Sequence, residues 1–129
     1  MKAPSLTLGI EEEYQILDPD TGELRSYIQE ILNEDHVTIQ QIKPEFHQSI
    51  VEVGTTVCET PAELRREVVR LRRTVHDLAA ESGLRIAAAG THPFSSWLDQ
   101  EVTPLERYVT LQEDLQEVAR KNLIFGMHV

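Results

Sequence analysis

Three consecutive glutamates, Glu11 to Glu13, lie inside a segment that otherwise has the pattern of a β-strand. Side chains alternate between the two faces of a strand, so this pattern puts Glu11 and Glu13 on one face and Glu12 on the other. Because Glu12 shares its face with apolar residues, we expect it to lie near an edge or to have a partner. The apolar residues on that face are Leu8, Ile10, Tyr14 and Ile16.

The pair formed by Glu11 and Glu13 has two interpretations. Their positions lie roughly 7 Å apart along a strand, and for an arbitrary pair of acids a solvated face is the commoner arrangement. Alternatively, a cation held between the carboxylates, with oxygen ligands at about 2.1 Å if it is magnesium, would remove their repulsion. The pair is therefore a candidate metal site.

A further acid occurs in a strand predicted from Gln48 to Val57. Alternation places Ser49, Val51 and Val53 on one face and Glu52 on the other. An unpaired carboxylate in an apolar segment usually becomes neutral, finds a partner or binds a metal. Glu52 is accordingly a second candidate ligand.

Composition limits the classes of partner. The chain has 129 residues, with 12 Lys+Arg against 22 Asp+Glu and a formal charge of -10, which argues against binding to nucleic acid or anionic lipid. The single cysteine, Cys58, excludes an internal disulfide, and we expect it to be a buried, unreactive thiol. No apolar run approaches the roughly 20 residues of a membrane span. These features predict a soluble, cytoplasmic protein.

The remaining elements follow from turn, cap and periodicity signals. Residues 18–22 predict a turn rather than a calcium loop, because the glycine comes one place early and Gln29 stands where a closing glutamate is needed. A short helix is predicted over 27–32 and a strand over 37–42. Thr60, Pro61 and Glu63 form a helix-start signal, and this helix should end near Ser82 before Gly83. Its apolar stripe comprises Leu64, Val68, Leu71, Val75 and Leu78. Arg66, Arg70 and Arg73 lie opposite the stripe, with Arg65 and Arg72 at its margins. We expect these arginines to form a solvated face; a phosphate site or subunit contact is the less favoured alternative.

The second half of the chain predicts a strand over 86–89, a helix that starts at Thr103 to Glu106 and reaches about Arg120, and a strand over 123–129. His92 follows the first of these strands in a loop, where ligands often bind, and is a substrate-binding candidate. The order of elements predicts an α+β fold, an antiparallel sheet with helices on one face.

Four strings in this order resemble the glutamate-cysteine ligase type 2 family of ATP-dependent carboxylate-amine ligases. They are Gly9-Ile10-Glu11-Glu12-Glu13, Glu45-Phe46-His47-Gln48-Ser49-Ile50-Val51-Glu52, Gly90-Thr91-His92-Pro93-Phe94 and Phe125-Gly126-Met127-His128-Val129. The resemblance covers nearly the whole chain. It implies part of a glutamine-synthetase-like ligase fold, in which a funnel over the sheet holds ATP, Mg2+ and an amino-acid substrate.

The resemblance also implies site residues. Glu11, Glu13, Glu45 and Glu52 match metal-binding carboxylates, and His128 matches a histidine near the nucleotide. No catalytic residue is assigned. Because the spacing of Glu45 and Glu52 is odd, a straight strand would put them on opposite faces, so a bulge or bend after Pro44 is required.

The chemistry of such a ligase suits an acidic protein. ATP converts a carboxylate into an acyl phosphate, and an amine then displaces phosphate; the expected substrates are glutamate and cysteine or another amine. Carboxylates repel phosphates, but magnesium reverses the sign of that interaction. No glycine-lysine phosphate loop and no G-x-G-x-x-G string occurs to suggest another nucleotide fold. A homo-oligomer is compatible with this interpretation.

Length is the main departure from the family, whose members run to roughly two to three domain-lengths of about 150 residues each. We therefore expect residues 1–129 to be the N-terminal part of a single, truncated catalytic domain, inactive and poorly stable alone. The alternative is a non-catalytic metal-binding or interaction fragment of such a ligase. The two differ in that a ligase should bind magnesium and ATP synergistically, whereas a plain cation site should bind the metal equally well without ATP.

Overall fold

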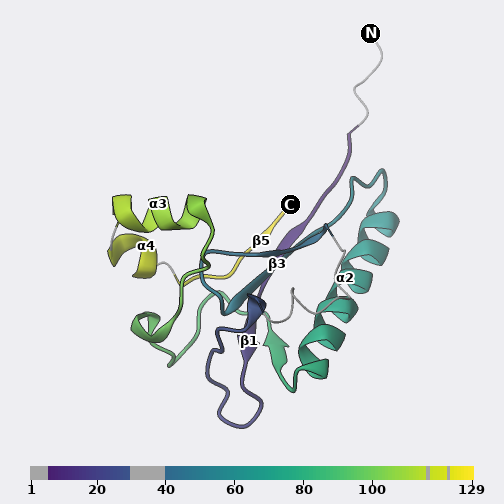
Figure 1. Cartoon of the computed structure of the whole chain (residues 1–129). Helices are drawn as coiled ribbons and strands as arrows, with labels where there is room; N and C mark the ends of the chain where they lie inside the picture. The colour runs from purple at the N-terminus through teal and green to yellow at the C-terminus, as the bar shows by residue number, and fades with distance from the viewer. Residues whose placement is uncertain (1–5, 30–39, 116, 122) are drawn as a thin grey trace.

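A computed structural model describes residues 6–29, 40–115, 117–121 and 123–129 of the chain. Its centre is a five-stranded antiparallel sheet (Figure 1). The strands are β1 (Glu11–Leu17), β2 (Ile42–Pro44), β3 (Ile50–Gly54), β4 (Arg85–Ala87) and β5 (Met127–His128). The helices are α2 (Pro61–Glu81), the 3-10 helix η1 (Trp97–Asp99), α3 (Glu106–Leu115) and α4 (Glu117–Lys121). The predicted α+β class with an antiparallel sheet is confirmed.

Strand β1 organises the sheet because both of its edges are paired. Along one edge β1 pairs with β3, and the other edge of β3 pairs with β2. The other edge of β1 is shared: β4 pairs with the end of β1, and β5 pairs with its beginning at Glu11 and Glu12. Strand β5 therefore lies beside the beginning of β1, which carries the glutamates. Figure 1 shows β5 alongside β1.

Helix α2 covers the face of the sheet that carries Tyr14 and Ile16. Thr60 caps it by accepting a hydrogen bond from the Glu63 N–H at 3.2 Å, and Gly83, with φ of 71°, follows its end. The buried side chains of the helix pack on those of β1, β2 and β3, each worth about 1.5–3 kcal/mol of burial. The core consists of Tyr14, Ile16, Ile28, Ile42, Val51, Val53, Leu71 and Val75. The predicted extent of this helix and its apolar stripe are confirmed.

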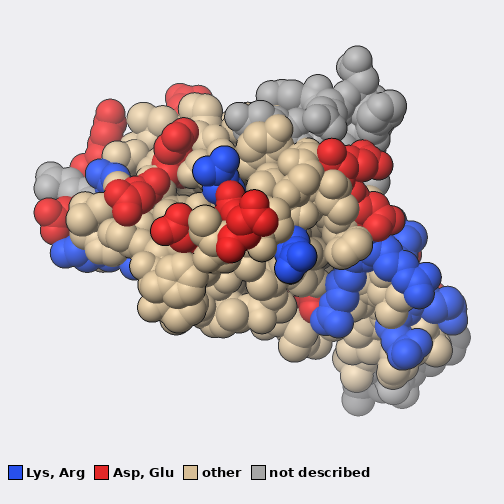
Figure 2. All heavy atoms as spheres, turned by 90° about the horizontal axis from the view of Figure 1, so that it is seen from below, with Lys and Arg blue, Asp and Glu red and all other residues tan. Residues whose placement is uncertain are grey.

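The arginines on the outer side of α2 are exposed, as predicted for Arg65, Arg66, Arg70 and Arg73. Figure 2 shows basic side chains gathered on the α2 side of the underside, while acidic side chains are spread over the rest of that face. Arg70 forms an ion pair with Glu67 at 2.9 Å, so part of this charge is neutralised within the helix.

The second long helix starts differently from the prediction. It begins at Glu106, and Thr103 does not cap it: Thr103 is buried, and its hydroxyl donates to the backbone carbonyl of Glu45. The predicted span to Arg120 is occupied by α3 and α4, with residue 116 outside the described residues. The two helices lie beside the sheet (Figure 1), where Tyr108 and Ala119 pack with Phe46.

Several strands are shorter than their patterns indicate. The predicted 48–57 strand is β3, and the predicted 123–129 strand pairs with β1 only at Met127 and His128. Of the predicted 37–42 strand, only Ile42 lies in β2, and residues 37–39 lie outside the described residues. Residues 30–32 of the predicted short helix also lie outside the described residues. The 18–22 turn and the buried Cys58 are confirmed. Among the described residues, no helix is long and apolar enough to cross a membrane.

Candidate functional site

The strand register places three of the predicted site acids and one histidine on the same face of the sheet. Glu13 stands directly opposite Glu52 of β3, and Glu11 stands opposite His128 of β5. Residues paired in this way have Cβ atoms about 4.5–5.5 Å apart, and like charges in such positions repel. Glu11 and Glu13 face the same side, as the alternation predicted. We call Glu11, Glu13, Glu45 and Glu52 the acid face.

Glu52 shows the effect of this crowding. Burial raises its pKa, and the negative charges of Glu11, Glu45 and Glu13 raise it further. Lys43, whose Nζ lies 4.0 Å from the Glu52 carboxylate, acts in the opposite direction but does not compensate. A bound cation would favour the ionised form of Glu52 that its neighbours disfavour.

Glu45 reaches the acid face through a reversal of the chain. Strands β2 and β3 form a hairpin in which Lys43 is opposite Glu52 and Pro44 is opposite Val51. Glu45 directly follows β2 and comes to the side that carries Lys43 and Glu52, where its charge acts on Glu52 and it lines a groove with Glu13. The bend expected after Pro44 is thus a hairpin, and no bulge in a continuous strand is involved.

Helix α3 holds the carboxylate of Glu45. The Tyr108 hydroxyl donates a hydrogen bond to Glu45, and the Arg107 guanidinium lies 4.3 Å from the centre of the Tyr108 ring. Burial raises the pKa of Tyr108, and the hydrogen bond to Glu45 raises it further. The hydroxyl therefore keeps its proton and remains a hydrogen-bond donor to Glu45. Helix α3, which is far from Glu45 in the sequence, thus fixes the position of the Glu45 carboxylate.

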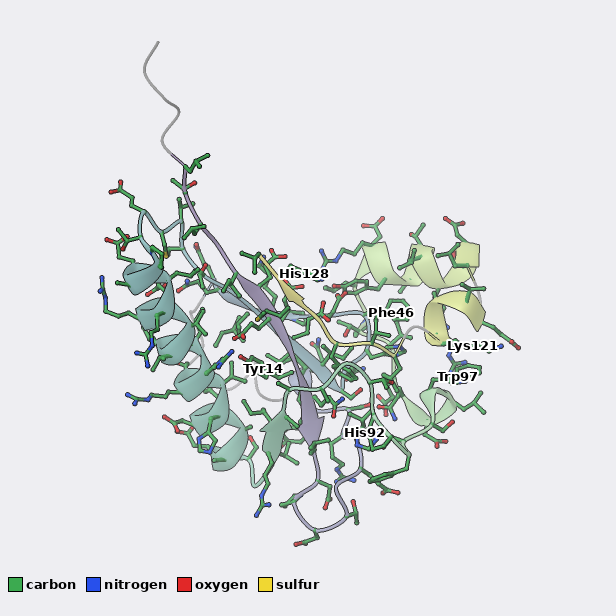
Figure 3. The ribbon with its side chains drawn as sticks, turned by 180° about the vertical axis from the view of Figure 1, so that it is seen from behind. Tyr14, Phe46, His92, Trp97, Lys121 and His128 are labelled. Carbon is green, nitrogen blue, oxygen red and sulfur yellow. The ribbon has the colours of Figure 1, made fainter. Side chains whose placement is uncertain are left out.

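His128 lies at the rim of the acid face. Its Nδ1 is 4.0 Å from a carboxylate oxygen of Glu11, and both side chains are largely exposed. Figure 3 shows His128 on β5 beside β1. Just before it, the N–H of Gly126 donates to the Glu13 carboxylate at 2.7 Å, so one oxygen of Glu13 already has a partner.

A groove of about 670 Å³ opens beside the acid face. Glu13, Glu45 and His128 contribute polar groups to it, whereas α3, α4 and residues 124–125 supply an apolar lining that includes Leu111 and Phe125. His128 also lines a second hollow of about 550 Å³ with Glu11 and Lys43. The histidine therefore borders both hollows.

The donor atoms of the acid face suit magnesium in kind, because Mg2+ prefers carboxylate oxygens. Within residues 6–29, 40–115, 117–121 and 123–129, however, no three His, Cys, Asp or Glu side chains converge as a ready metal cage. Magnesium usually binds through one or two carboxylates together with waters and substrate phosphates. The arrangement therefore fits a metal held jointly with a phosphate better than a metal held by protein alone.

The structure does not bring His92 to the acid face. Its Nε2–H donates to the carbonyl of Gly22 at 2.9 Å, and its Nδ1 accepts from the N–H of Ser95 at 2.9 Å. The Nε2 contact joins the loop to the turn that follows β1, and the Nδ1 contact fixes the ring within its own loop. His128, by contrast, pairs with the start of β1. Figure 3 shows the two histidines well separated.

Sequence reasoning did not identify Lys43, Thr103, Tyr108 or Gly126 as parts of the site. Thr103 and Tyr108 contact Glu45 from segments distant in sequence, for which a single chain carries no local signal. Lys43 meets Glu52 through the register of the β2–β3 hairpin. A signal did exist for Gly126: a glycine within a strand pattern often marks a close approach of other atoms.

The fold and the acid face define an α+β protein with a carboxylate-rich sheet surface suited to a metal-bridged anion. The chain belongs to glutamate-cysteine ligase family 2, whose sequence profile matches residues 7–129.

Individual relatives agree with this assignment. A protein of Herpetosiphon aurantiacus is 62% identical over 124 residues, covering 95% of this chain and 32% of that protein. A Roseiflexus castenholzii protein is 60% identical, covering 95% of this chain and 33% of its own length, and a Solibacter usitatus protein is 51% identical, covering 98% and 33%. All three are provisionally named glutamate–cysteine ligase 2. The chain spans about one third of the length of these relatives.

Proposed function

We propose that this chain is the N-terminal part of the catalytic domain of an ATP-dependent carboxylate-amine ligase of the glutamate–cysteine ligase type. The observation that carries the proposal is the juxtaposition of Glu13 and Glu52 across β1 and β3, with Glu11 on the same face. Family membership and the names of the relatives supply the reaction class. The cytoplasm, where the Cys58 thiol stays reduced, is the proposed compartment.

In this proposal, bound ATP and Mg2+ supply the phosphoryl group that activates the substrate carboxylate and the charge that neutralises phosphate. The chain itself contributes positioning. Glu11, Glu13 and Glu52 present oxygens on one rigid sheet face, and Tyr108 holds Glu45 at its edge. His128 stands at the rim, where it can contact a phosphate or a metal-bound group.

The geometry favours this function over a plain cation site. A metal held by protein alone needs several converging ligands, and the described part of the chain holds no such group. The acid face instead offers crowded carboxylates without enough local positive charge, as the raised pKa of Glu52 indicates. A metal that arrives with a triphosphate completes its coordination from the nucleotide.

The test uses a protein of the relatives' full length that carries this segment. Mg2+ binding is measured by calorimetry with and without a non-hydrolysable ATP analogue, and phosphate release is measured with glutamate, then with glutamate and cysteine. After subtraction of a titration of the analogue alone, which itself chelates Mg2+, we expect the analogue to strengthen Mg2+ binding to the protein about tenfold, a typical coupling between two ligands. We expect glutamate to stimulate phosphate release and cysteine to accelerate it. Equal Mg2+ affinity with and without the analogue would instead establish the non-catalytic cation site.

Substrate identity is tested separately by a screen of carboxylates and amines in the phosphate-release assay. If glutamate never stimulated release while another carboxylate did, the ligase class would stand and the substrate proposal would be wrong.

A further inference from the structure

Gly126 lies between two members of the candidate site. A Cβ atom at this position would come within 2.9 Å of Nε2 and 3.2 Å of Cε1 of His128, and within 3.6 Å of a carboxylate oxygen of Glu13. Contacts under 3.0 Å are closer than a Cβ atom tolerates, so the His128 ring can occupy its place only if residue 126 has no side chain.

The need for glycine here is one of space and not of backbone conformation. The positive-φ glycines in the described part of the chain are Gly22 and Gly83, so Gly126 has a backbone that an alanine could adopt. A change to alanine would therefore act mainly by pushing the His128 imidazole away.

The backbone of Gly126 also holds Glu13. Its N–H donates to the Glu13 carboxylate at 2.7 Å, while its carbonyl accepts from the Glu13 N–H at 2.9 Å. A hydrogen bond to an ionised carboxylate is short and roughly twice as strong as one between neutral groups. This two-point contact fixes the side chain of Glu13 and leaves its second oxygen for another partner.

We propose that Gly126 is a positioning residue of the site, an inference that rests on the proposed ligase function. Its N–H orients Glu13 so that this carboxylate presents one oxygen to a metal–nucleotide complex. Its missing side chain lets the His128 ring lie over the backbone beside Glu11. One residue thereby couples the histidine of β5 to the carboxylates of β1.

The first test measures the position of the ring without metal or nucleotide. In the full-length protein, histidine is labelled with 13C at Cε1, and the His128 resonance is assigned from its absence in His128→Ala. We expect Gly126→Ala to shift this resonance. The control is Gly90→Ala, because a Cβ at Gly90 meets nothing within 4 Å, and it should leave the resonance unchanged. An unshifted His128 resonance in Gly126→Ala would overturn the proposal.

The second test measures affinity for Mn2+ by electron paramagnetic resonance in the presence of the ATP analogue AMP-PNP. Four proteins are compared: the parent, Gly126→Ala, His128→Ala and the double variant. We expect each single change to weaken Mn2+ binding about tenfold, the lower end for residues that orient metal ligands. Because the clash requires the ring, the double variant should be no weaker than His128→Ala alone.

Additive losses in the double variant would overturn the coupling of Gly126 to His128, because they would mean that the alanine disturbs the site without meeting the ring. Thermal unfolding separates this result from a loss of fold: alanine in place of glycine at an ordinary φ stabilises slightly, so the double variant should be at least as stable as His128→Ala. Glu52→Gln tests the proposed function independently. If it binds Mn2+–AMP-PNP like the parent, the ligase site is wrong; if it weakens binding while Gly126→Ala does not, the role of Gly126 is wrong.

Discussion

Glutamates on the two faces of the sheet have pKa values shifted in opposite directions. Glu12 points toward α2 and is 5% exposed, yet Arg72 and the Tyr14 hydroxyl both donate hydrogen bonds to it. Burial opposes ionisation of Glu12, but these donors outweigh it and hold its pKa below the usual range. On the other face, Glu52 opposite Glu13 has a raised pKa because burial and like charges are not compensated.

This difference separates a structural acid from candidate functional acids. A carboxylate that the protein has fully paired joins one element to another, in this case β1 to α2. Carboxylates that the protein has crowded together without matching positive charge are poised for a ligand that supplies it. The predictions below test that distinction, beginning with the largest expected effect.

The acid face should control activity without supporting the fold. In a protein of full length, Glu52→Gln or Glu11→Gln should reduce ATP-dependent phosphate release at least about 100-fold, equivalent to about 2.7 kcal/mol of barrier. Urea unfolding should show unchanged or slightly greater stability, because a repelling charge is removed. The control is Glu81→Gln, an exposed acid at the end of α2, with parent-like release. Parent-like turnover of both acid-face variants would refute the assignment.

The opposite face should control stability. Arg72→Ala leaves the buried carboxylate of Glu12 without its charged partner and should lower the free energy of unfolding by about 1.5–3 kcal/mol, the value of hydrogen bonds to a charged group. The matched control is Arg73→Ala, an exposed neighbour on the same helix, with a change within about 0.5 kcal/mol. Equal effects of the two variants would show that the Arg72–Glu12 pair contributes nothing.

The pH dependence of stability should have opposite signs for the two faces. Because the pKa of Glu12 is lowered, its stabilisation is complete above the ordinary value of 4.5 and is lost as the pH falls through its folded-state pKa. Because the pKa of Glu52 is raised, its protonated form favours folding below pH 4.5, and that advantage is lost as the pH rises through its folded-state pKa.

Unfolding is therefore compared between pH 3 and pH 7 for the parent, Glu12→Gln and Glu52→Gln. Relative to the parent, Glu12→Gln should be least stable at neutral pH and recover at low pH. Glu52→Gln should gain relative to the parent as the pH rises. The same slope for both differences would contradict the contrast between the faces.

The smallest expected effect concerns His92, which the sequence suggested as a substrate-binding residue. Its two ring nitrogens are both used by backbone groups, so His92→Ala should cost about 1–2 kcal/mol of stability through lost hydrogen bonds. The affinity for Mn2+ with AMP-PNP and the KM for glutamate should stay at parent values. A raised KM without a stability change would restore His92 as a substrate-binding residue.

Local signals in the sequence predicted the parts of the fold that depend on neighbours along the chain. The Thr60 cap, the stripe of α2 ending before Gly83, and the alternation that separates Glu12 from Glu11 and Glu13 are all confirmed, because each depends on residues a few positions apart. The same kind of local signal gave a wrong prediction at Thr103, which does not cap α3. A cap pattern was present there, but a buried hydrogen bond to the carbonyl of Glu45 uses the hydroxyl instead.

The sequence by itself determined which side chains can share a face: the period of a strand follows from backbone stereochemistry, and it grouped Glu11 with Glu13 and isolated Glu12. Only the tertiary structure decided which strands meet and in what register. It placed Glu52 opposite Glu13, brought Glu45 to the same side through a hairpin, and set Gly126 between Glu13 and His128. Those pairings join residues far apart in the chain, and their energies arise from packing and hydrogen bonds that exist only after the chain has closed on itself.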